Sequence, residues 1–145
     1  MVYRIFVLMM FLFVLGCGPI LVMPGGGLDR TTSTVPTDWR WTDDVSTIQL
    51  ETRPDDPYSV NLWIIALGDS LLVHAGTNRA AWVEHIEANA SVRVQVEEKI
   101  FELVATRVSE QSEFDAFSDA YEKKYSVRPR HEDVREAYLY RLRAR

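Results

Sequence analysis

The stretch that decides the fold covers residues 58–108 and reads YSVNLWIIALGDSLLVHAGTNRAAWVEHIEANASVRVQVEEKIFELVATRV. Its first part alternates between polar and apolar side chains, as a half-buried strand does. Gly68 and Asp69 then form a two-residue hairpin loop, because glycine tolerates the positive φ that such loops require. The pattern therefore predicts a strand over residues 58–67 and a returning strand over residues 70–75.

The second part of this stretch predicts a helix and two further strands. Apolar residues recur at helical spacing from Trp82 onward and form one apolar face. Thr77 and Asn78 precede this face, and their side chains can accept hydrogen bonds from first-turn amides, so we expect them to cap the helix. Alternating residues then predict strands over residues 91–96 and 100–108.

Further elements flank the stretch on both sides. Residues 47–53 alternate and predict a strand, which a proline- and aspartate-rich turn ends. An aromatic stripe at helical spacing predicts a helix over residues 112–125, with Ser112 and Asp115 placed as a capping box. Residues 138–142 alternate again and predict a last strand.

These elements predict one mostly β domain over residues 38–145. We expect an antiparallel, Greek-key-like barrel with two main helices packed outside it. With 47% hydrophobic and 26% charged residues, the chain can bury a core and is not of the disordered class. The net charge of −5 and the absence of a basic run argue against a nucleic-acid partner.

The N-terminus predicts export and a lipid anchor. Residues 1–17 read MVYRIFVLMMFLFVLGC, in which one arginine precedes an apolar run of signal-peptide length, short for a membrane span. Cys17, the only cysteine, directly follows this run. The final VLGC resembles the bacterial lipobox, which implies cleavage after residue 16 and acylation of Cys17. An ordinary cleaved signal and an uncleaved anchor are the alternatives.

Acylation of Cys17 would make the membrane a partner and place the protein in the cell envelope. Gly18, not an acidic residue, follows the cysteine. By resemblance to enterobacterial lipoproteins, this favours the periplasmic face of the outer membrane. Residues 17–37 are rich in Gly, Pro, Ser and Thr and are expected to form a flexible tether. The chain thus divides into a lipoprotein signal peptide (1–16), this tether and the domain.

One group of side chains has the composition of a nucleotide-like ligand site. A helix N-terminus favours an anion through its unpaired amides and dipole, and the Arg79 guanidinium fits phosphate. Two tryptophans could stack on a flat ring while an imidazole and an amide bind its edge. The predicted cofactor-binding residues are Asn61, Trp63, His74, Thr77, Asn78, Arg79 and Trp82.

The order of elements and two short motifs resemble the flavin-binding split barrel, the superfamily of pyridoxamine phosphate oxidases and deazaflavin-dependent reductases. Thr77-x-Arg79 is similar in kind to a Ser-x-Lys before the helix, and Asn89-Ala90 matches half of an Asn-Pro after it. Over residues 47–108, the resemblance implies a split β-barrel that binds FMN or a related flavin or deazaflavin. It also implies an oxidoreductase and a homodimer. The glycine-rich phosphate motif of the deazaflavin reductases is missing.

Other interpretations of the same residues stay open. Arg79 could pair with Glu84 on the surface, and Trp82 could belong to the core. No catalytic side chain stands out, so the catalytic residues stay unassigned. No two histidines have the i, i+4 spacing of a helical metal site, so we predict no metal site. The alternative function is a non-catalytic interaction module of the envelope on the same barrel. Haem binding through His74 is a third possibility.

Overall fold

The computed structural model of the protein describes residues 25–76 and 79–145. The predicted signal peptide, Cys17 and the first part of the tether lie outside the described residues, as do Thr77 and Asn78. No helix in the described part is long and apolar enough to cross a bilayer.

Strands make up most of the described fold. They are β1 (Thr47–Thr52), β2 (Tyr58–Trp63), β3 (Ile65–Leu67), β4 (Ser70–His74), β5 (Ser91–Val96), β6 (Lys99–Arg107) and β7 (Leu139–Arg143). The helices are α1 (Ala81–Ala88) and α2 (Gln111–Tyr125), with 3-10 turns η1 (Arg40–Thr42) and η2 (Val134–Glu136). Outside the first half of residues 58–108, each predicted strand agrees with the structure to within one residue at each end. The second predicted helix agrees equally well.

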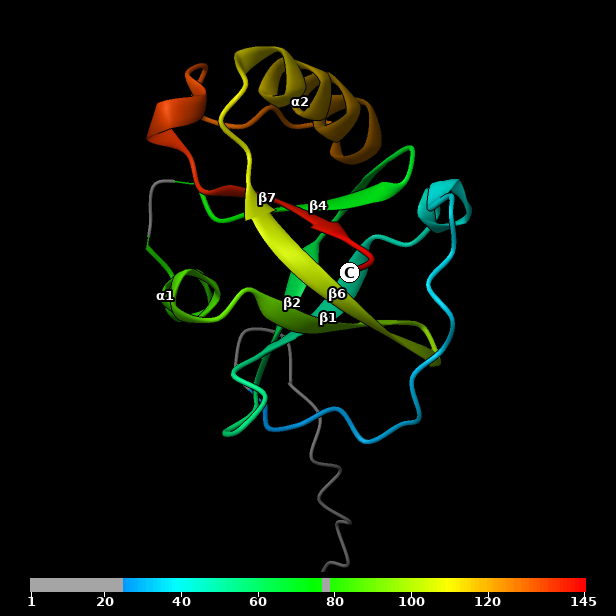
Figure 1. The fold of residues 1–145 in the computed structure, drawn as a ribbon. Coiled ribbons are helices and arrows are strands. Elements are labelled where there is room, and N and C mark those ends of the chain that lie inside the picture. The colour runs from blue at the N-terminus through cyan, green and yellow to red at the C-terminus, as the bar shows by residue number, and fades with distance from the viewer. Residues whose placement is uncertain (1–24, 77–78) are drawn as a thin grey trace, which may run out of the picture.

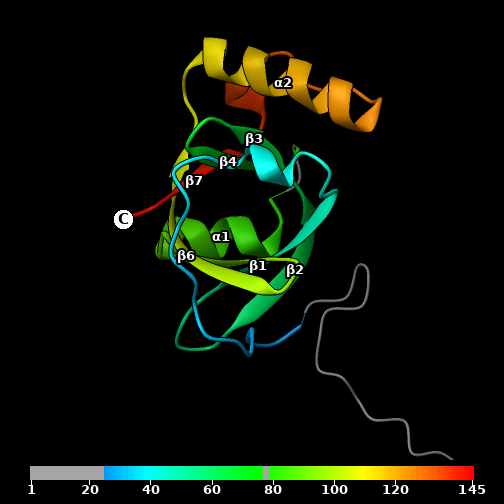
Figure 2. The ribbon, with the colours of Figure 1, turned by 90° about the vertical axis from the view of Figure 1, so that its right-hand side faces the viewer.

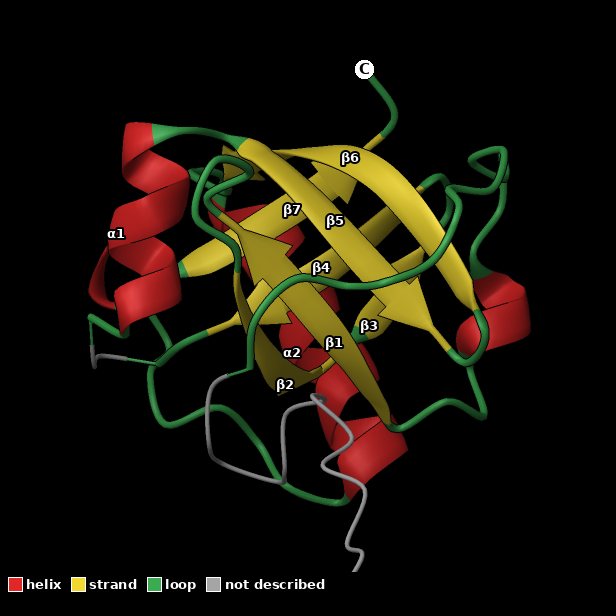
Figure 3. Ribbon diagram, turned by 90° about the horizontal axis from the view of Figure 1, so that it is seen from below, coloured by secondary structure: helices red, strands yellow, loops and turns green. Residues whose placement is uncertain are grey.

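The strands form one curled antiparallel sheet in the order β2-β1-β5-β6-β7-β4-β3 (Figure 1). α2 lies across the outer side of β3, β4 and β7 (Figure 2), and α1 lies at one end of the barrel (Figure 3). The predicted fold class, a mostly β split barrel with two packed helices, is confirmed.

The prediction of a single strand over residues 58–67 is wrong, because the chain changes partners at Ile64. β2 pairs with β1, whereas β3 pairs with β4, so this residue joins the two ends of the strand order. The Tyr125 hydroxyl accepts a 3.0 Å hydrogen bond from the Ile64 amide, and it lies 2.9 Å from the Ile64 carbonyl oxygen. This side chain supplies the hydrogen bonds that the interrupted ladder cannot. Burial raises the pKa of Tyr125 to about 12.

The sheet buries apolar residues on both of its faces along β4. Leu71 and Val73 point into the barrel, as their alternation predicts. Leu72 points the other way, and it is fully buried in a cluster with Phe114 and Phe117 of α2. The covering helix therefore turns the outer face of this strand into a second core.

Both predicted helices are present, but their first residues differ from the predicted starts. α1 begins at Ala81 with Ala80 at its N-cap, and the predicted caps Thr77 and Asn78 lie outside the described residues. α2 begins at Gln111, and no side chain caps its first turn. The capping box was assigned from spacing alone, which does not show where the first helical residue lies.

Residues 25–37, here called the N-terminal strap, run over the outer side of β1, β5 and β6 (Figure 3). Gly25 forms a bridge with Ser59 of β2, and the Ser33 amide donates to the Ile100 carbonyl at 2.6 Å. Leu28 is 7% exposed. Described residues before the predicted boundary at Asp38 therefore already pack against the barrel.

Candidate functional site

The two tryptophans of the predicted site have different environments. Trp82 is only 3% exposed, and its ring packs edge-on to Tyr140 inside the barrel, with centroids 5.9 Å apart. Trp63 is 47% exposed and stacks on Tyr125 at 4.4 Å with an interplanar angle of 10°. Trp82 is therefore a core residue, and one face of Trp63 is already covered.

The Arg79 guanidinium lies along the surface of α1. Its Nε atom is 3.7 Å from a carboxylate oxygen of Glu84, and an Nη atom pairs with Glu87. The carboxylate of Glu87 raises the pKa of Arg79. These two acids therefore already pair with the guanidinium that we predicted to bind a phosphate.

His74 ends β4 and lies under α2. Its ring contacts Phe117 at 5.5 Å and Tyr121 at 6.2 Å between centroids. Its Nε2 atom is buried without a hydrogen-bond partner in the described part of the chain. Burial, with a smaller contribution from the positive charge of His131, lowers the pKa of His74 to about 4. The imidazole is thus neutral at pH 7.

A hollow of about 350 Å³ opens beside this imidazole. Its walls are the end of β4 with Ala75 and Gly76, Tyr121 of α2, and residues 127–131 of the loop that follows α2. We call it the His74 hollow. Seven residues were predicted to bind a cofactor. Among the described residues that line the His74 hollow, His74 is the one that belongs to this predicted set.

The His74 hollow is lined by cationic side chains. Arg128 binds Asp119 at 3.1 Å and Glu122 at 2.5 Å, whereas Arg130 pairs with no carboxylate in the described part of the chain. The His131 Nδ1 atom is 3.2 Å from a carboxylate oxygen of Glu136. None of the described lining residues is acidic. The described lining therefore contains basic but no acidic side chains, although neighbouring acids pair with Arg128 and His131.

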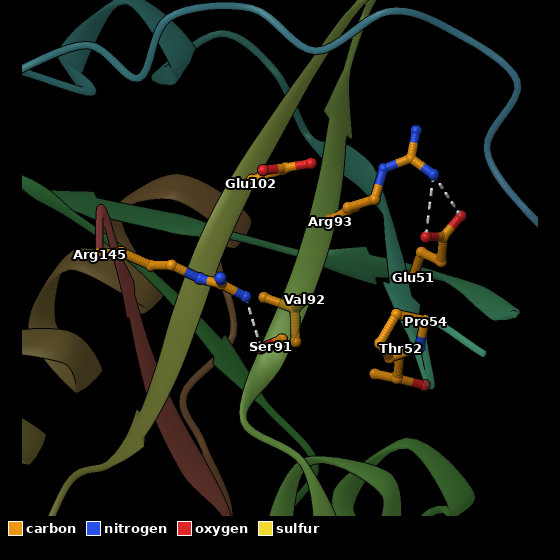
Figure 4. A pocket seen from close by; sticks show the side chains of 8 residues that line it. All are labelled: Glu51, Thr52, Pro54, Ser91, Val92, Arg93, Glu102 and Arg145. Atoms are coloured by element: carbon orange, nitrogen blue, oxygen red, sulfur yellow. Dashed lines mark hydrogen bonds and ion pairs between the residues drawn. The ribbon is translucent and has the colours of Figure 1, made fainter.

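Two other hollows have mixed charge. One of about 210 Å³ is lined by two arginines and two glutamates, and Figure 4 shows Arg93 directed at Glu51 and Arg145 at Ser91. The other, of about 340 Å³, lies between η1, β3 and α2. There Lys124 donates to the Thr42 carbonyl, and Asp43 shares the lining. Neither hollow presents an excess of positive charge as clear as that beside His74.

Among the described residues, the structure brings together only part of the predicted site. Asn61 lies on β2 opposite Gln49 of β1. Trp63 stacks on Tyr125 and His74 contacts Phe117, and both rings also contact Tyr121 of α2. No group of three or more potential metal ligands occurs among the described residues. The site predicted from the sequence did not include the basic residues of the run Arg128-Pro129-Arg130-His131. The density of positive charge in this run was the signal that could have identified them.

Comparison with known proteins gives matches in structure alone. No family model matches the chain, and none of the curated proteins matches it. A candidate pyridoxamine 5′-phosphate oxidase from Listeria innocua superposes with a TM-score of 0.55 at 14% identity, over 69% of this chain and 84% of its own. The fold is that of a split barrel.

A second solved structure supports the same fold for this split barrel. A candidate 5-nitroimidazole antibiotic resistance protein from Bacteroides thetaiotaomicron has a TM-score of 0.55 at 12% identity, over 75% of this chain and 81% of its own. At such identities the likeness extends to the path of the backbone. The side chains that line the split barrel's hollows must be judged on their own geometry.

Proposed function

We propose that this split barrel binds a flavin-type cofactor in the His74 hollow and acts as an oxidoreductase. The observation that carries the proposal is a neutral, partly buried imidazole beside a hollow whose charged lining is cationic. The likeness of the backbone to a candidate pyridoxamine 5′-phosphate oxidase supports the choice of cofactor. The cofactor supplies the redox chemistry when bound, and the protein supplies position and charge.

The residues present fit such a group. A hollow of about 350 Å³ lies within the range of roughly 300–1,000 Å³ that small-molecule sites occupy. Tyr121 offers an aromatic wall, and a neutral His74 can donate or accept a hydrogen bond. Arg130 pairs with no carboxylate of the described residues, so it is the cation available to an anionic group of the cofactor. The proposal keeps His74 from the predicted site and replaces Arg79 by Arg130, because the acids of α1 hold Arg79.

Flavin binding is tested on protein purified from its own host. We expect a flavin absorption band, and quenching of added flavin fluorescence by protein stripped of ligand. The His74→Phe variant keeps an aromatic ring under α2 but loses its polar atoms, so affinity should fall about tenfold for the lost hydrogen bond. Arg79→Ala is the matched control and should bind as the wild type does.

The absorption spectrum also separates the alternatives. A colourless protein that ignores added flavin would refute the cofactor proposal and favour a non-catalytic interaction module. A Soret band would favour haem. If Arg79→Ala weakened binding and His74→Phe did not, the site would lie on the α1 side of the barrel, as the sequence predicts.

We also propose that Cys17 carries a lipid that anchors the barrel in the cell envelope. Its position directly after the apolar run supports this. Several acyl chains would hold the protein firmly, because each buried methylene contributes roughly 0.8 kcal/mol. Cells fed labelled palmitate should incorporate it into the wild-type protein and not into Cys17→Ser. Equal labelling of the two proteins would rule out this anchor.

A further inference from the structure

We infer that the N-terminal strap holds one end of the barrel, the β1–β2 turn (residues 53–57), against a lipid surface and directs the His74 hollow away from it. The inference rests on the proposed acylation of Cys17, which supplies the lipid. It goes further in naming the face of the barrel that lies on the headgroups and the face that stays in water.

The strap is fixed to the outer side of the barrel by buried groups. The Leu28 side chain is buried, and the Leu28 amide donates to the carboxylate of Glu51, which is 2% exposed. The Arg93 guanidinium donates to the Leu28 carbonyl at 3.0 Å. Farther along, the Ser33 amide donates to the Ile100 carbonyl at 2.6 Å. Because buried polar groups are costly to leave unpaired, the strap moves with the barrel as one body.

The strap begins at the end of the barrel opposite α2, where Figure 2 draws it in blue. Its first described residue, Gly25, exchanges two backbone hydrogen bonds with Ser59 near the start of β2. β2 runs away from this point and ends at Trp63, which stacks on Tyr125 of α2. The chain therefore reaches the barrel beside the β1–β2 turn, on the side opposite α2 and the His74 hollow.

Chain length limits how an anchored barrel can be turned. Eight residue steps separate Cys17 from Gly25, and they reach at most roughly 29 Å when fully extended. A domain of this size is roughly 35 Å across, so the end that carries α2 cannot reach the headgroups. If the strap were not fixed to the barrel, the chain from Cys17 to Asp38 could reach roughly 75 Å and would permit any orientation.

The β1–β2 turn is suited to lie on headgroups and not to enter the bilayer. Asp55 and Asp56 are exposed in it, and Arg53 pairs with Asp56 at 3.1 Å. Charged groups are costly to bury in hydrocarbon. The large apolar side chains that the described part of the molecule exposes belong to η1, the far end of β2 and the loop after α2. The His74 hollow, on the opposite side, then takes its ligand from the aqueous phase.

Energy transfer to the bilayer tests this orientation on the full-length protein. The protein is placed in vesicles of phosphatidylethanolamine and phosphatidylglycerol that carry an acceptor dye on the headgroups. Cys17 is the only cysteine, so once it is acylated a maleimide donor dye reacts with an introduced cysteine alone. Asp55→Cys places the donor in the β1–β2 turn, and Ala116→Cys places it on the exposed side of α2. Transfer from Asp55→Cys should be at least about twofold greater, because the two sites lie at opposite ends of a barrel roughly 35 Å across.

A lengthened chain is the matched control for the strap. About twelve Gly and Ser residues inserted between residues 24 and 25 leave the contacts of the strap in place, but they extend the reach of the chain to roughly 70 Å. The difference between the two dye positions should then disappear. A difference that persisted would overturn the role assigned to the strap.

The outcomes separate this inference from the lipid anchor. Equal transfer from the two dye positions, in protein with an acylated Cys17, overturns the inference and leaves the anchor intact. Greater transfer from Ala116→Cys overturns it as well. A free Cys17 thiol, detected as dye uptake by protein without an introduced cysteine, refutes the anchor and the inference with it.

Discussion

Replacing Trp82 with alanine is expected to lower the free energy of unfolding by about 3–5 kcal/mol. The side chain is 3% exposed and belongs to the core inside the barrel, with Val83 and Ile86 on the same helix. Removing the indole leaves a cavity that neighbouring strands cannot fill, because their positions are set by the sheet. Urea denaturation followed by circular dichroism measures the loss.

Trp63→Ala is the matched control for this change. Trp63 is 47% exposed, and its ring stacks on Tyr125 and makes a tilted contact with Tyr121. Its replacement should therefore cost about 0.5–1.5 kcal/mol, the usual contribution of an aromatic pair. If Trp82→Ala unfolded like the wild type and lost only flavin affinity, Trp82 would be a stacking platform for a ligand and not a core residue.

Replacing Arg93 with methionine is expected to destabilise the protein by about 3 kcal/mol. Glu51 is 2% exposed, and Arg93 is its partner at 3.1 Å. Without Arg93 the buried carboxylate loses its counter-ion, and breaking such a pair typically costs about 3–5 kcal/mol. We expect the low end of this range because the Arg93 side chain is 26% exposed and water reaches it.

The same substitution should loosen the N-terminal strap. The Leu28 amide donates to Glu51 at 2.5 Å, and the Arg93 guanidinium donates to the Leu28 carbonyl at 3.0 Å. Hydrogen exchange at the amides of Leu28 and Ser33 should therefore accelerate in Arg93→Met. Adding Glu51→Gln removes the unpaired charge and should recover part of the stability. A single variant as stable as the wild type would show that this pair contributes nothing.

Periodicity was a reliable guide to the strands because a sheet with one buried face imposes alternation on the chain. Leu71 and Val73 are buried inside the barrel as their spacing indicates. The Gly68 turn was likewise predictable, since its φ of 59° is cheap for glycine. The aromatic stripe of α2 correctly predicted a helix with a buried face.

The site that we propose shares only His74 with the site predicted from the sequence. The sequence-based prediction chose His74 by residue type and Arg79 as the anion-binding cation, whereas the proposal uses Arg130. A guanidinium binds whichever acids lie nearest, and the helix that follows places Glu84 and Glu87 beside it. The charge of Arg130, far along the chain from His74, could not be connected with it without the packing of α2.

The sequence by itself determined the element types, the inward faces of the strands and the hairpin at Gly68, because these depend on neighbours a few residues apart. Tertiary structure decided that the chain changes partners at Ile64 and that α2 covers His74. It also decided that Arg79 has two acidic partners, whereas Arg130 has none among the described residues. Each of these depends on groups distant in sequence, whose meeting is settled by how the sheet curls and where the helix packs.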